Sequence, residues 1–306
     1  MFVFAASDKG GTGRSVTSCN LLYRSALQGN DVCYVDFDFG SPTAGAIFGI
    51  ERAETGTDSG SGLHRYLLHH VPSPERIDVW TDTDSKAVRD RPDSAGRLVL
   101  LPGDLGGSDF QNRSEDLTAQ CLDLFLQLKS EFKLCIVDLS AGRNLAVETA
   151  LKVTAMPQMQ NVQSRWLVFH RWTRQHVMAA GGLVNGPRGL LGSAKEYGHD
   201  PEQFRANLRY VRTAVIDPAS STQRGLTAAQ GSWLRQCNTR LAGLAGESQV
   251  GKNLLLGSIP LDPVLQWQEQ LITDSDVAKG IANEETRNAF NALAERLVDD
   301  AAWGIL

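Results

Sequence analysis

The chain opens on a hydrophobic run that leads into a glycine-rich loop, Phe2-Val3-Phe4-Ala5-Ala6-Ser7-Asp8-Lys9-Gly10-Gly11-Thr12-Gly13-Arg14-Ser15. The run Phe2–Ser7 is typical of a buried β-strand, and Arg14–Leu27 has the composition of a helix. A strand, a glycine loop and a helix in this order form the context in which a glycine motif binds phosphate. This stretch therefore predicts an α/β fold and a phosphate site together.

The loop has the residue types that phosphate binding requires. Glycines let backbone N–H groups converge on phosphate oxygens without interference from Cβ atoms, and the helix N-terminus adds partial positive charge. The hydroxyl of Ser15 is a candidate ligand for Mg²⁺. An ordinary glycine turn between a strand and a helix would have a similar sequence, so the loop alone leaves both interpretations open.

Further short apolar runs recur with helix-length segments between them. We expect strands at Val32–Asp36, Arg97–Leu101, Leu134–Asp138, Trp166–His170, Leu208–Ile216 and Leu254–Ile259. Continuous apolar strands of this kind are typical of a parallel sheet that is covered on both faces. With right-handed crossovers, the predicted fold is a three-layer α/β structure with a doubly wound, mostly parallel sheet. In such sheets the ligand binds at the carboxyl ends of the strands.

Three aspartates stand at the carboxyl ends of predicted strands. Asp36 and Asp38 end the second strand, and Asp138 ends a later one. Carboxylates that face a phosphate loop hold Mg²⁺ and an attacking water in P-loop ATPases. Each aspartate alone is more typical of a strand-end cap, but their combination with the loop favours a nucleotide site. We therefore expect Ser15, Asp36, Asp38 and Asp138 to form the metal site.

At this point the sequence resembles the ParA/MinD family of P-loop ATPases. The extra lysine at the front of the loop is the mark of the family's deviant Walker A motif. Four further segments are similar to family motifs and extend the resemblance over nearly the whole chain: Asn20-Leu21, Val35-Asp36-Phe37-Asp38-Phe39-Gly40, Asp138-Leu139-Ser140-Ala141-Gly142 and Gly257-Ser258-Ile259-Pro260-Leu261-Asp262. The resemblance is weakest at residues 50–95 and 150–250.

The resemblance implies that the chain binds ATP or ADP with Mg²⁺ and dimerises with ATP. Lys9 would reach across a face-to-face homodimer to the phosphates of the other subunit, and Asp38 would position the hydrolytic water; these two are the catalytic candidates. Asp36 and Asp138 would support the metal and its water shell. The implied nucleotide contacts are Lys9, Gly10, Gly11, Thr12, Gly13, Arg14, Ser15, Val16, Pro260 and Asp262.

Two loop positions depart from the family pattern. Arg14 stands where a second lysine is usual, and Val16 replaces the usual threonine. Arginine keeps the positive charge, but its planar guanidinium cannot occupy the space of a compact ammonium group. Val16 lacks a hydroxyl that would contact the α-phosphate. Nucleotide binding is still expected, whereas hydrolysis is expected to be slow.

Composition fits one domain in a reducing compartment. The chain has 306 residues, of which 42% are hydrophobic and 21% charged, which is ordinary for a globular protein. We expect a single P-loop ATPase domain over 1–306, with insertion-like surface loops at about 52–62 and 81–96. The five cysteines are odd in number and contain no C-x-x-C pair, which predicts reduced, mostly buried thiols and a cytoplasmic location.

The motifs do not identify the output surface, which is the surface through which the protein would act on DNA, a membrane or a partner protein. The segment 165–212 carries eight basic and three acidic residues on a chain of net charge −5, so non-specific DNA binding and a protein partner both stay open, and we favour the protein. Phe290, Leu293 and Leu297 form an apolar helical stripe that is expected to pack on the core. The acidic residues that follow disfavour direct membrane binding.

Three functional classes follow from these motifs. The first is an ATP-hydrolysing switch that controls the positioning or assembly of a partner. The second is a nucleotide-binding adaptor, or pseudo-ATPase, with little hydrolysis because of Arg14 and Val16. The third is a small-molecule ligase or synthase of a related P-loop branch, although nothing outside the loop suggests a substrate pocket. The pair Asp36 and Asp38, together with Lys9, favours the switch.

Overall fold

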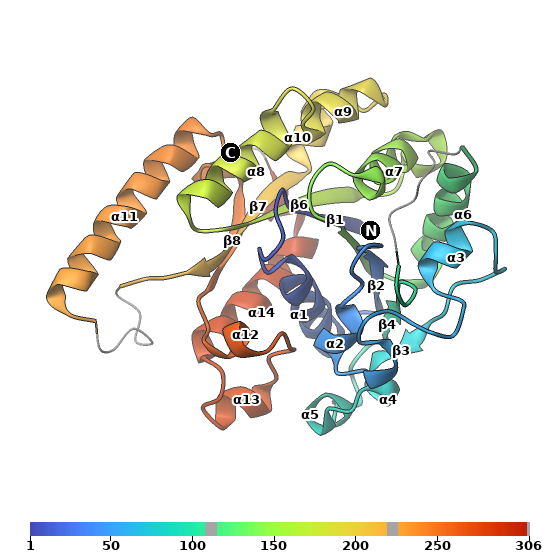
Figure 1. The fold of residues 1–306 in the computed structure, drawn as a ribbon, viewed down its shortest axis with the longest axis horizontal. Helices are drawn as coiled ribbons and strands as arrows, with labels where there is room; N and C mark the ends of the chain where they lie inside the picture. Colours follow the sequence, from blue (N-terminus) through green and yellow to red (C-terminus); the bar gives the residue numbers. More distant parts are fainter. Residues whose placement is uncertain (108–114, 219–225, 305–306) are drawn as a thin grey trace.

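The computed structural model describes residues 1–107, 115–218 and 226–304, and it contains an eight-stranded sheet with helices on both faces (Figure 1). The strand order is β3-β4-β2-β5-β1-β6-β7-β8. All neighbours are parallel except β3, which runs antiparallel to β4 at one edge. The strands are β1 (Phe2–Ala6), β2 (Val32–Phe37), β3 (Ile77–Asp78), β4 (Leu98–Leu101), β5 (Leu134–Leu139), β6 (Ser164–Arg171), β7 (Leu208–Val215) and β8 (Leu255–Pro260). The predicted fold class is confirmed.

Helices fill most of the connections between these strands. The α-helices are α1 (Arg14–Leu27), α2 (Ala44–Phe48), α3 (Leu63–Leu67), α4 (Val79–Asp82), α5 (Lys86–Arg89), α6 (Glu115–Glu131), α7 (Leu145–Ala155), α8 (Arg174–Asn185), α9 (Leu190–Glu196), α10 (Pro201–Ala206), α11 (Ala228–Glu247), α12 (Val264–Trp267), α13 (Asp274–Ala278) and α14 (Glu284–Val298). The 3₁₀-helices are η1 (Glu51–Ala53), η2 (Pro157–Met159), η4 (Lys252–Leu254) and η5 (Asp300–Trp303).

The predicted strands are all present, and the first helix has the predicted bounds. The short strand β3 was not predicted, because two residues at a sheet edge carry no periodic signal. The expected loop at 81–96 is only partly a loop, since it contains the end of α4 and all of α5. Helix α5 was not predicted because the segment is polar, and Val88 is the one fully buried residue of this helix. Residues 52–62 include part of η1 and otherwise form turns and isolated β-bridges.

Apart from the two-residue β3, the strands send side chains into two separate hydrophobic cores, one on each face of the sheet. In β1, Phe2 and Phe4 belong to the core on one face of the sheet, whereas Val3 and Ala5 belong to the core on the other. Helices α6, α7 and α8 cover the first face, and α1 and α14 cover the second. Burial on both faces explains why the central strands are mostly apolar and show no alternation of apolar and polar residues. The stripe on α14 (Phe290, Leu293 and Leu297) is buried, as predicted.

Helix α1 is tied to a segment that is distant in sequence. The fully buried Asn20 donates from Nδ2 to the carbonyl of Gln270 (3.0 Å) and accepts from the Ile272 N–H (2.8 Å). Arg24, also buried, donates to the Ile272 carbonyl at 2.5 Å and pairs with Asp274 at 2.9 Å. Buried polar groups satisfied in this way stabilise one geometry. The segment after β8 is therefore held against the middle and the C-terminal part of α1.

The cysteines behave as the composition predicts. All five are free thiols; Cys237 is half-buried and the other four are buried. Burial raises the pKa of the Cys121 thiol above its ordinary value, which keeps it protonated and unreactive. In the part of the chain that the structure describes, no helix is long and apolar enough to cross a membrane.

Candidate functional site

The glycine loop leaves β1 and enters α1 through two residues in the left-handed region. Gly11 has φ 69° and Gly13 has φ 73°, a backbone conformation that favours glycine. Gly13 is the N-cap of α1 and has no side chain to cap it. The N–H groups of the first helical turn therefore stay available to an anion, as the sequence predicts.

Neighbouring strands and loops hold the loop in this shape. The hydroxyl of Thr213, at the carboxyl end of β7, donates to the Thr12 carbonyl at 2.6 Å. On the other side, the N–H of Gly142 donates to the Ser7 carbonyl at 2.7 Å. The loop is thus fastened to β7 and to the segment after β5, at the carboxyl edge of the sheet where ligands bind in doubly wound folds.

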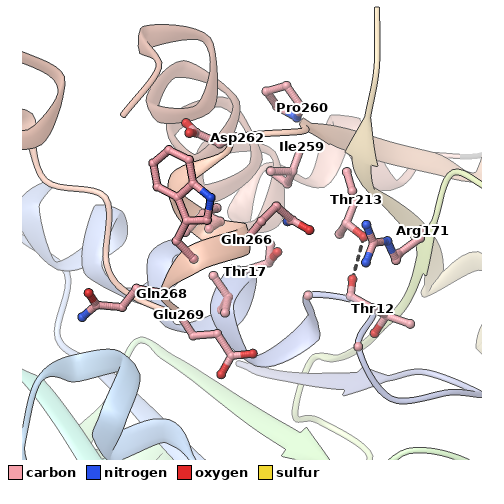
Figure 2. A pocket seen from close by; sticks show the side chains of 16 residues that line it. Thr12, Thr17, Arg171, Thr213, Ile259, Pro260, Asp262, Gln266, Gln268 and Glu269 are labelled. Atoms are coloured by element: carbon pink, nitrogen blue, oxygen red, sulfur yellow. Dashed lines mark hydrogen bonds between the residues drawn. The ribbon is translucent and has the colours of Figure 1, made fainter. Parts of the chain in front are cut away.

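A cavity of about 520 Å³ opens beside the loop. Figure 2 shows Thr12, Thr213 and Arg171 on one side of it and Gln268 and Glu269 on another. Its size is within the range of small-ligand pockets. Of the residues predicted to contact nucleotide, Gly11, Thr12, Gly13, Val16, Pro260 and Asp262 line this cavity.

Asp262 lines the cavity, but its carboxylate already accepts hydrogen bonds from the backbone. The carboxylate is buried and accepts the N–H groups of Val264 (3.2 Å) and Asn283 (2.9 Å). Its role here is to fix the turn after β8, while Pro260 and the residues beyond form the surface.

Several lining residues were not predicted: Thr17, Arg171, Thr213, Ala214, Ile259, Leu265, Gln266, Trp267, Gln268 and Glu269. Arg171 and Thr213 follow the rule that strand carboxyl ends face the ligand, so this rule could have found them. The residues 265–269 lie close to the loop, and Asn20 and Arg24 tie the segment that follows them to α1. No local pattern in the sequence carries that information.

Next to the cavity, Arg14 lies inside the predicted cluster of aspartates. Its Nε donates to Asp138, its Nη2 lies 2.8 Å from Asp38, and its Nη1 donates to Ser7 at 3.2 Å. Only 6% of the Arg14 side chain is exposed, compared with 23% for Asp38. The fork of the guanidinium thus bridges the ends of three strands, which a lysine ammonium could not do in the same way.

The third carboxylate, Asp36, lies beside this bridge without a guanidinium of its own. It is the parallel-register partner of Asp138 on the adjacent strand, and it accepts the Asp38 N–H at 3.2 Å. Burial, reinforced by Asp138 and Asp38, raises the pKa of Asp36 well above its ordinary value. Burial also raises the pKa of Asp38, although Arg14 opposes the shift. Three carboxylates next to one guanidinium leave an excess of negative charge, which a proton or a cation can neutralise.

This donor set fits a magnesium ion bound together with phosphate. Mg²⁺ prefers hard oxygen ligands and usually keeps several waters or substrate phosphates. Half-buried Ser15 in the first turn of α1 and the carboxylates of Asp36, Asp38 and Asp138 provide such oxygens. Among the described residues, no three His, Cys, Asp or Glu side chains form a ready-made metal cage. Phosphate or water would therefore have to complete the coordination.

The remaining predicted residues lie at the outer side of the loop. Lys9 and Gly10 are exposed and do not line the cavity. Asp8 pairs with Arg143 at 3.1 Å, which links the front of the loop to the segment after β5. Lys9 thus stands at the surface, away from the cavity of its own subunit.

A parallel sheet with a glycine loop between β1 and α1, and acidic strand ends beside it, defines a P-loop nucleotide-binding protein. The chain belongs to the CobQ/CobB/MinD/ParA nucleotide-binding domain family, whose pattern matches residues 3–265. The resemblance to ParA and MinD seen in the motifs is thereby confirmed.

Individual relatives agree with this assignment. The septum site-determining protein MinD of Synechocystis is 28% identical over 172 residues, which are 53% of this chain and 55% of that protein; the match therefore spans about half of its length. A plasmid partition protein from Borrelia burgdorferi, solved with AMPPNP, has a TM-score of 0.60 at 14% identity, over 96% of both chains. MinD from Pyrococcus horikoshii, solved with Mg-ADP, has a TM-score of 0.53 at 16% identity, over 98% of this chain and 96% of the other. At these identities the structures support the shared fold.

The buried charge of Asp36 predicts a pH-dependent gain in stability for Asp36→Asn. The unfolded pKa is about 3.9, and the folded pKa is raised. The destabilisation by Asp36 is therefore absent below about pH 4, grows as the pH rises from there towards the folded pKa, and is complete above the folded pKa. Asparagine keeps the acceptor for the Asp38 N–H. We expect Tm at pH 7 to rise by about 2 °C or more, which corresponds to about 1 kcal/mol in a domain of this size.

Thermal unfolding followed by circular dichroism at pH 7 and pH 4 measures this effect. Asp138→Asn is the comparison, because it weakens the bridge to Arg14 and should lower Tm at pH 7. A lower Tm for Asp36→Asn at pH 7, or an equal gain at both pH values, would contradict the assignment of the excess charge to Asp36.

Proposed function

We propose that this chain binds Mg-ATP at the loop, dimerises with ATP, and hydrolyses it slowly as a switch that controls the positioning or assembly of a partner. The observation that carries the proposal is the pairing of an open glycine loop with a guanidinium that is engaged by two of the three aspartates. In this proposal residues 1–306 act as one P-loop domain in a reducing, cytoplasmic environment.

Nucleotide binding is supported by the shape and the donors of the cavity. Gly11 and Gly13 turn the backbone toward an anion, and the uncapped start of α1 favours negative charge. The segment from Pro260 to Glu269 provides a wall against which a base can pack. Bound Mg²⁺ would neutralise phosphate charge, with Ser15 and the aspartates as its protein ligands and water-shell partners.

Slow hydrolysis is supported by the position of Arg14. Asp38, the residue proposed to orient the attacking water, pairs with the Arg14 guanidinium at 2.8 Å. A carboxylate in an ion pair is a weaker acceptor for water, and an engaged guanidinium does not stabilise developing charge on phosphate. Turnover therefore requires Arg14 to exchange its aspartates for phosphate, and a partner that favours this exchange would accelerate it.

The same observation favours an adaptor with little hydrolysis as the second candidate. If Arg14 keeps its bridge to Asp138 when nucleotide is bound, Asp38 stays occupied, and the nucleotide serves only to hold the dimer together. The two candidates differ in whether turnover depends on Asp38.

The burial of two basic residues supports a protein, and not DNA, as the molecule on which the switch acts. Arg165 and Arg209 are 1% and 3% exposed, and their guanidinium groups lie 4.5 and 5.3 Å from the centroid of the Trp303 ring. These two side chains cannot contact phosphates on DNA. The segment 165–212 is therefore less basic at its surface than its composition suggests.

The first test is binding of Mg-ATP to the loop. Isothermal titration calorimetry on the full chain should give saturable binding that Ser15→Ala weakens by about tenfold or more, since a metal-ligand hydroxyl is lost. Gly13→Trp should abolish binding, because φ 73° and the loop geometry exclude the side chain. Gln28→Ala, an exposed change at the other end of α1, is the control. Equal affinities in all four proteins would remove the assignment.

The second test concerns turnover. Arg14→Lys should raise the basal ATPase rate by about tenfold, because a single ammonium cannot bridge Asp138 and Asp38 as the guanidinium fork does. Asp38→Ala should abolish this gain. Phosphate release under saturating Mg-ATP measures both. A wild-type rate of about 1 s⁻¹ or more would contradict slow hydrolysis, and a rate in Arg14→Lys that ignores Asp38 would favour the adaptor.

The third test is ATP-dependent association. Lys9 is exposed and does not line its own cavity, so we expect it to act on the nucleotide of another copy. Sedimentation velocity with AMPPNP should reveal a dimer that Lys9→Ala weakens by about tenfold or more. Lys86→Ala, on α5, removes another lysine and should have no effect. An oligomeric state that is independent of both nucleotide and Lys9 would contradict the dimer.

A further inference from the structure

A second cavity, of about 600 Å³, lies between the start of α8 and the helix α11. We call it the α8–α11 groove; its floor is formed mainly by Trp172, Leu234, Leu241, Leu244 and Leu261, and Trp233 and three arginines also line it. Figure 1 shows α11 at the periphery of the molecule, beside α8 and away from the main body of the sheet. The groove is thus an indentation on the outside of the fold.

Helix α11 is long for the little surface that it buries. It has 20 residues, of which only Gly231 and Ala245 are fully buried, and Trp233 is 60% exposed. Most of the stability of a helix in a protein comes from packing of its apolar face. A long helix with half-buried leucines and an exposed tryptophan is therefore typical of a surface that another chain covers.

The groove is built from residues that hold one another in place. The indole N–H of Trp172 donates to Asn238 Oδ1 at 3.1 Å, and Asn238 donates from Nδ2 to the Ile216 carbonyl at 3.2 Å. The guanidinium of Arg212 lies 3.9 Å from the centroid of the Trp172 ring. These contacts fasten α11 to the ends of β6 and β7, so a ligand would meet a preorganised surface.

The charges at this surface indicate what kind of partner fits. Arg171, Arg174 and Arg240 line the groove. Among the described residues no carboxylate forms an ion pair with these three arginines. An apolar floor edged by arginines complements an amphipathic segment that presents leucine-like side chains and acidic residues.

Two other occupants fit less well. DNA would satisfy the arginines but would leave the tryptophans and leucines exposed, and the buried Arg165 and Arg209 add nothing to a phosphate-binding face. A second copy docked symmetrically, groove to groove, would bring the same arginines together across a two-fold axis, where like charges repel. We propose that the α8–α11 groove binds an acidic amphipathic helix of a partner protein.

This inference rests on the proposed function in one respect, since it names the class of partner that the switch would control. The two cavities share Arg171 and Ala214 among their lining residues. Ala214 has φ 51° and lies where the β7–β8 register is interrupted. A partner in the groove would therefore touch residues that also form the wall of the nucleotide cavity.

The test uses the full chain and a fluorescein-labelled synthetic peptide. The probe is a helix-forming peptide with leucines at i and i+4 spacing and glutamates beside them. Two control peptides carry lysine for each glutamate or serine for each leucine. Fluorescence anisotropy should give saturable binding of the probe with Kd below about 100 μM, and both controls should bind at least about tenfold more weakly.

The double variant Arg174→Glu/Arg240→Glu reverses two exposed charges at the groove and should weaken probe binding by about tenfold or more. Trp233→Ser, at a residue that is 60% exposed, should also weaken it. Arg205→Glu, an exposed charge reversal on α10 outside the groove, is the matched control and should leave the affinity unchanged. Circular dichroism verifies that each variant is folded.

Any one of the following results would overturn the proposal. They are binding of the lysine peptide as tight as that of the probe, the absence of saturation at about 1 mM probe, an equal loss in Arg205→Glu, and tighter binding of a DNA duplex that depends on Arg174 and Arg240. Self-association that the double variant abolishes would assign the groove to a second copy and would also overturn it. Mg-ATP calorimetry on the same preparation separates failure of this proposal from failure of nucleotide binding, because the probe titration contains no nucleotide.

Discussion

The bridge from Arg14 to Asp138 and Asp38 is the interaction on which the arrangement of the site depends. It joins the start of α1 to the carboxyl ends of β2 and β5, and through Ser7 it also reaches the end of β1. Three carboxylates packed together beside a helix N-terminus would otherwise repel one another in a poorly solvated place. The guanidinium offsets part of this repulsion, and the hydroxyl of Tyr34 adds a donor to Asp138 at 2.5 Å.

The choice of arginine has a functional consequence that follows from its shape. A guanidinium can donate along two directions at once, so it can engage two carboxylates while it stays buried. The ammonium group of a lysine lies at the end of a flexible side chain, so it can move from a carboxylate to a phosphate more easily than a guanidinium that is paired with two carboxylates. The site therefore keeps its positive charge close to the loop but holds it in an ion-pair network, and this is the physical basis for the slow switch or adaptor that we propose.

The cavity depends on tethers between distant parts of the chain. Asn20 and Arg24 fasten the segment after β8 to α1, and Thr213 fastens the loop to β7. These contacts place walls of the cavity beside the glycine loop. On the outer side, Arg171 belongs both to the cavity and to the α8–α11 groove, so the nucleotide and a partner would be separated by little more than one layer of side chains.

The sequence alone determined the fold class, the positions of all strands in the described sheet except β3, the glycine loop and the aspartates at the strand ends. These features are local: burial on both faces of the sheet makes strands such as Phe2–Ala6 continuously apolar, and the left-handed φ values of Gly11 and Gly13 favour glycine. It also identified Arg14 as a departure from the family pattern.

Three features were decided by the tertiary structure alone. Arg14 pairs with the aspartates, the carboxylate of Asp262 accepts hydrogen bonds from the turn after β8, and Arg165 and Arg209 are buried. Each of these depends on partners more than a hundred residues away or on how a side chain is oriented, and neither a periodic pattern nor a count of charges contains that information.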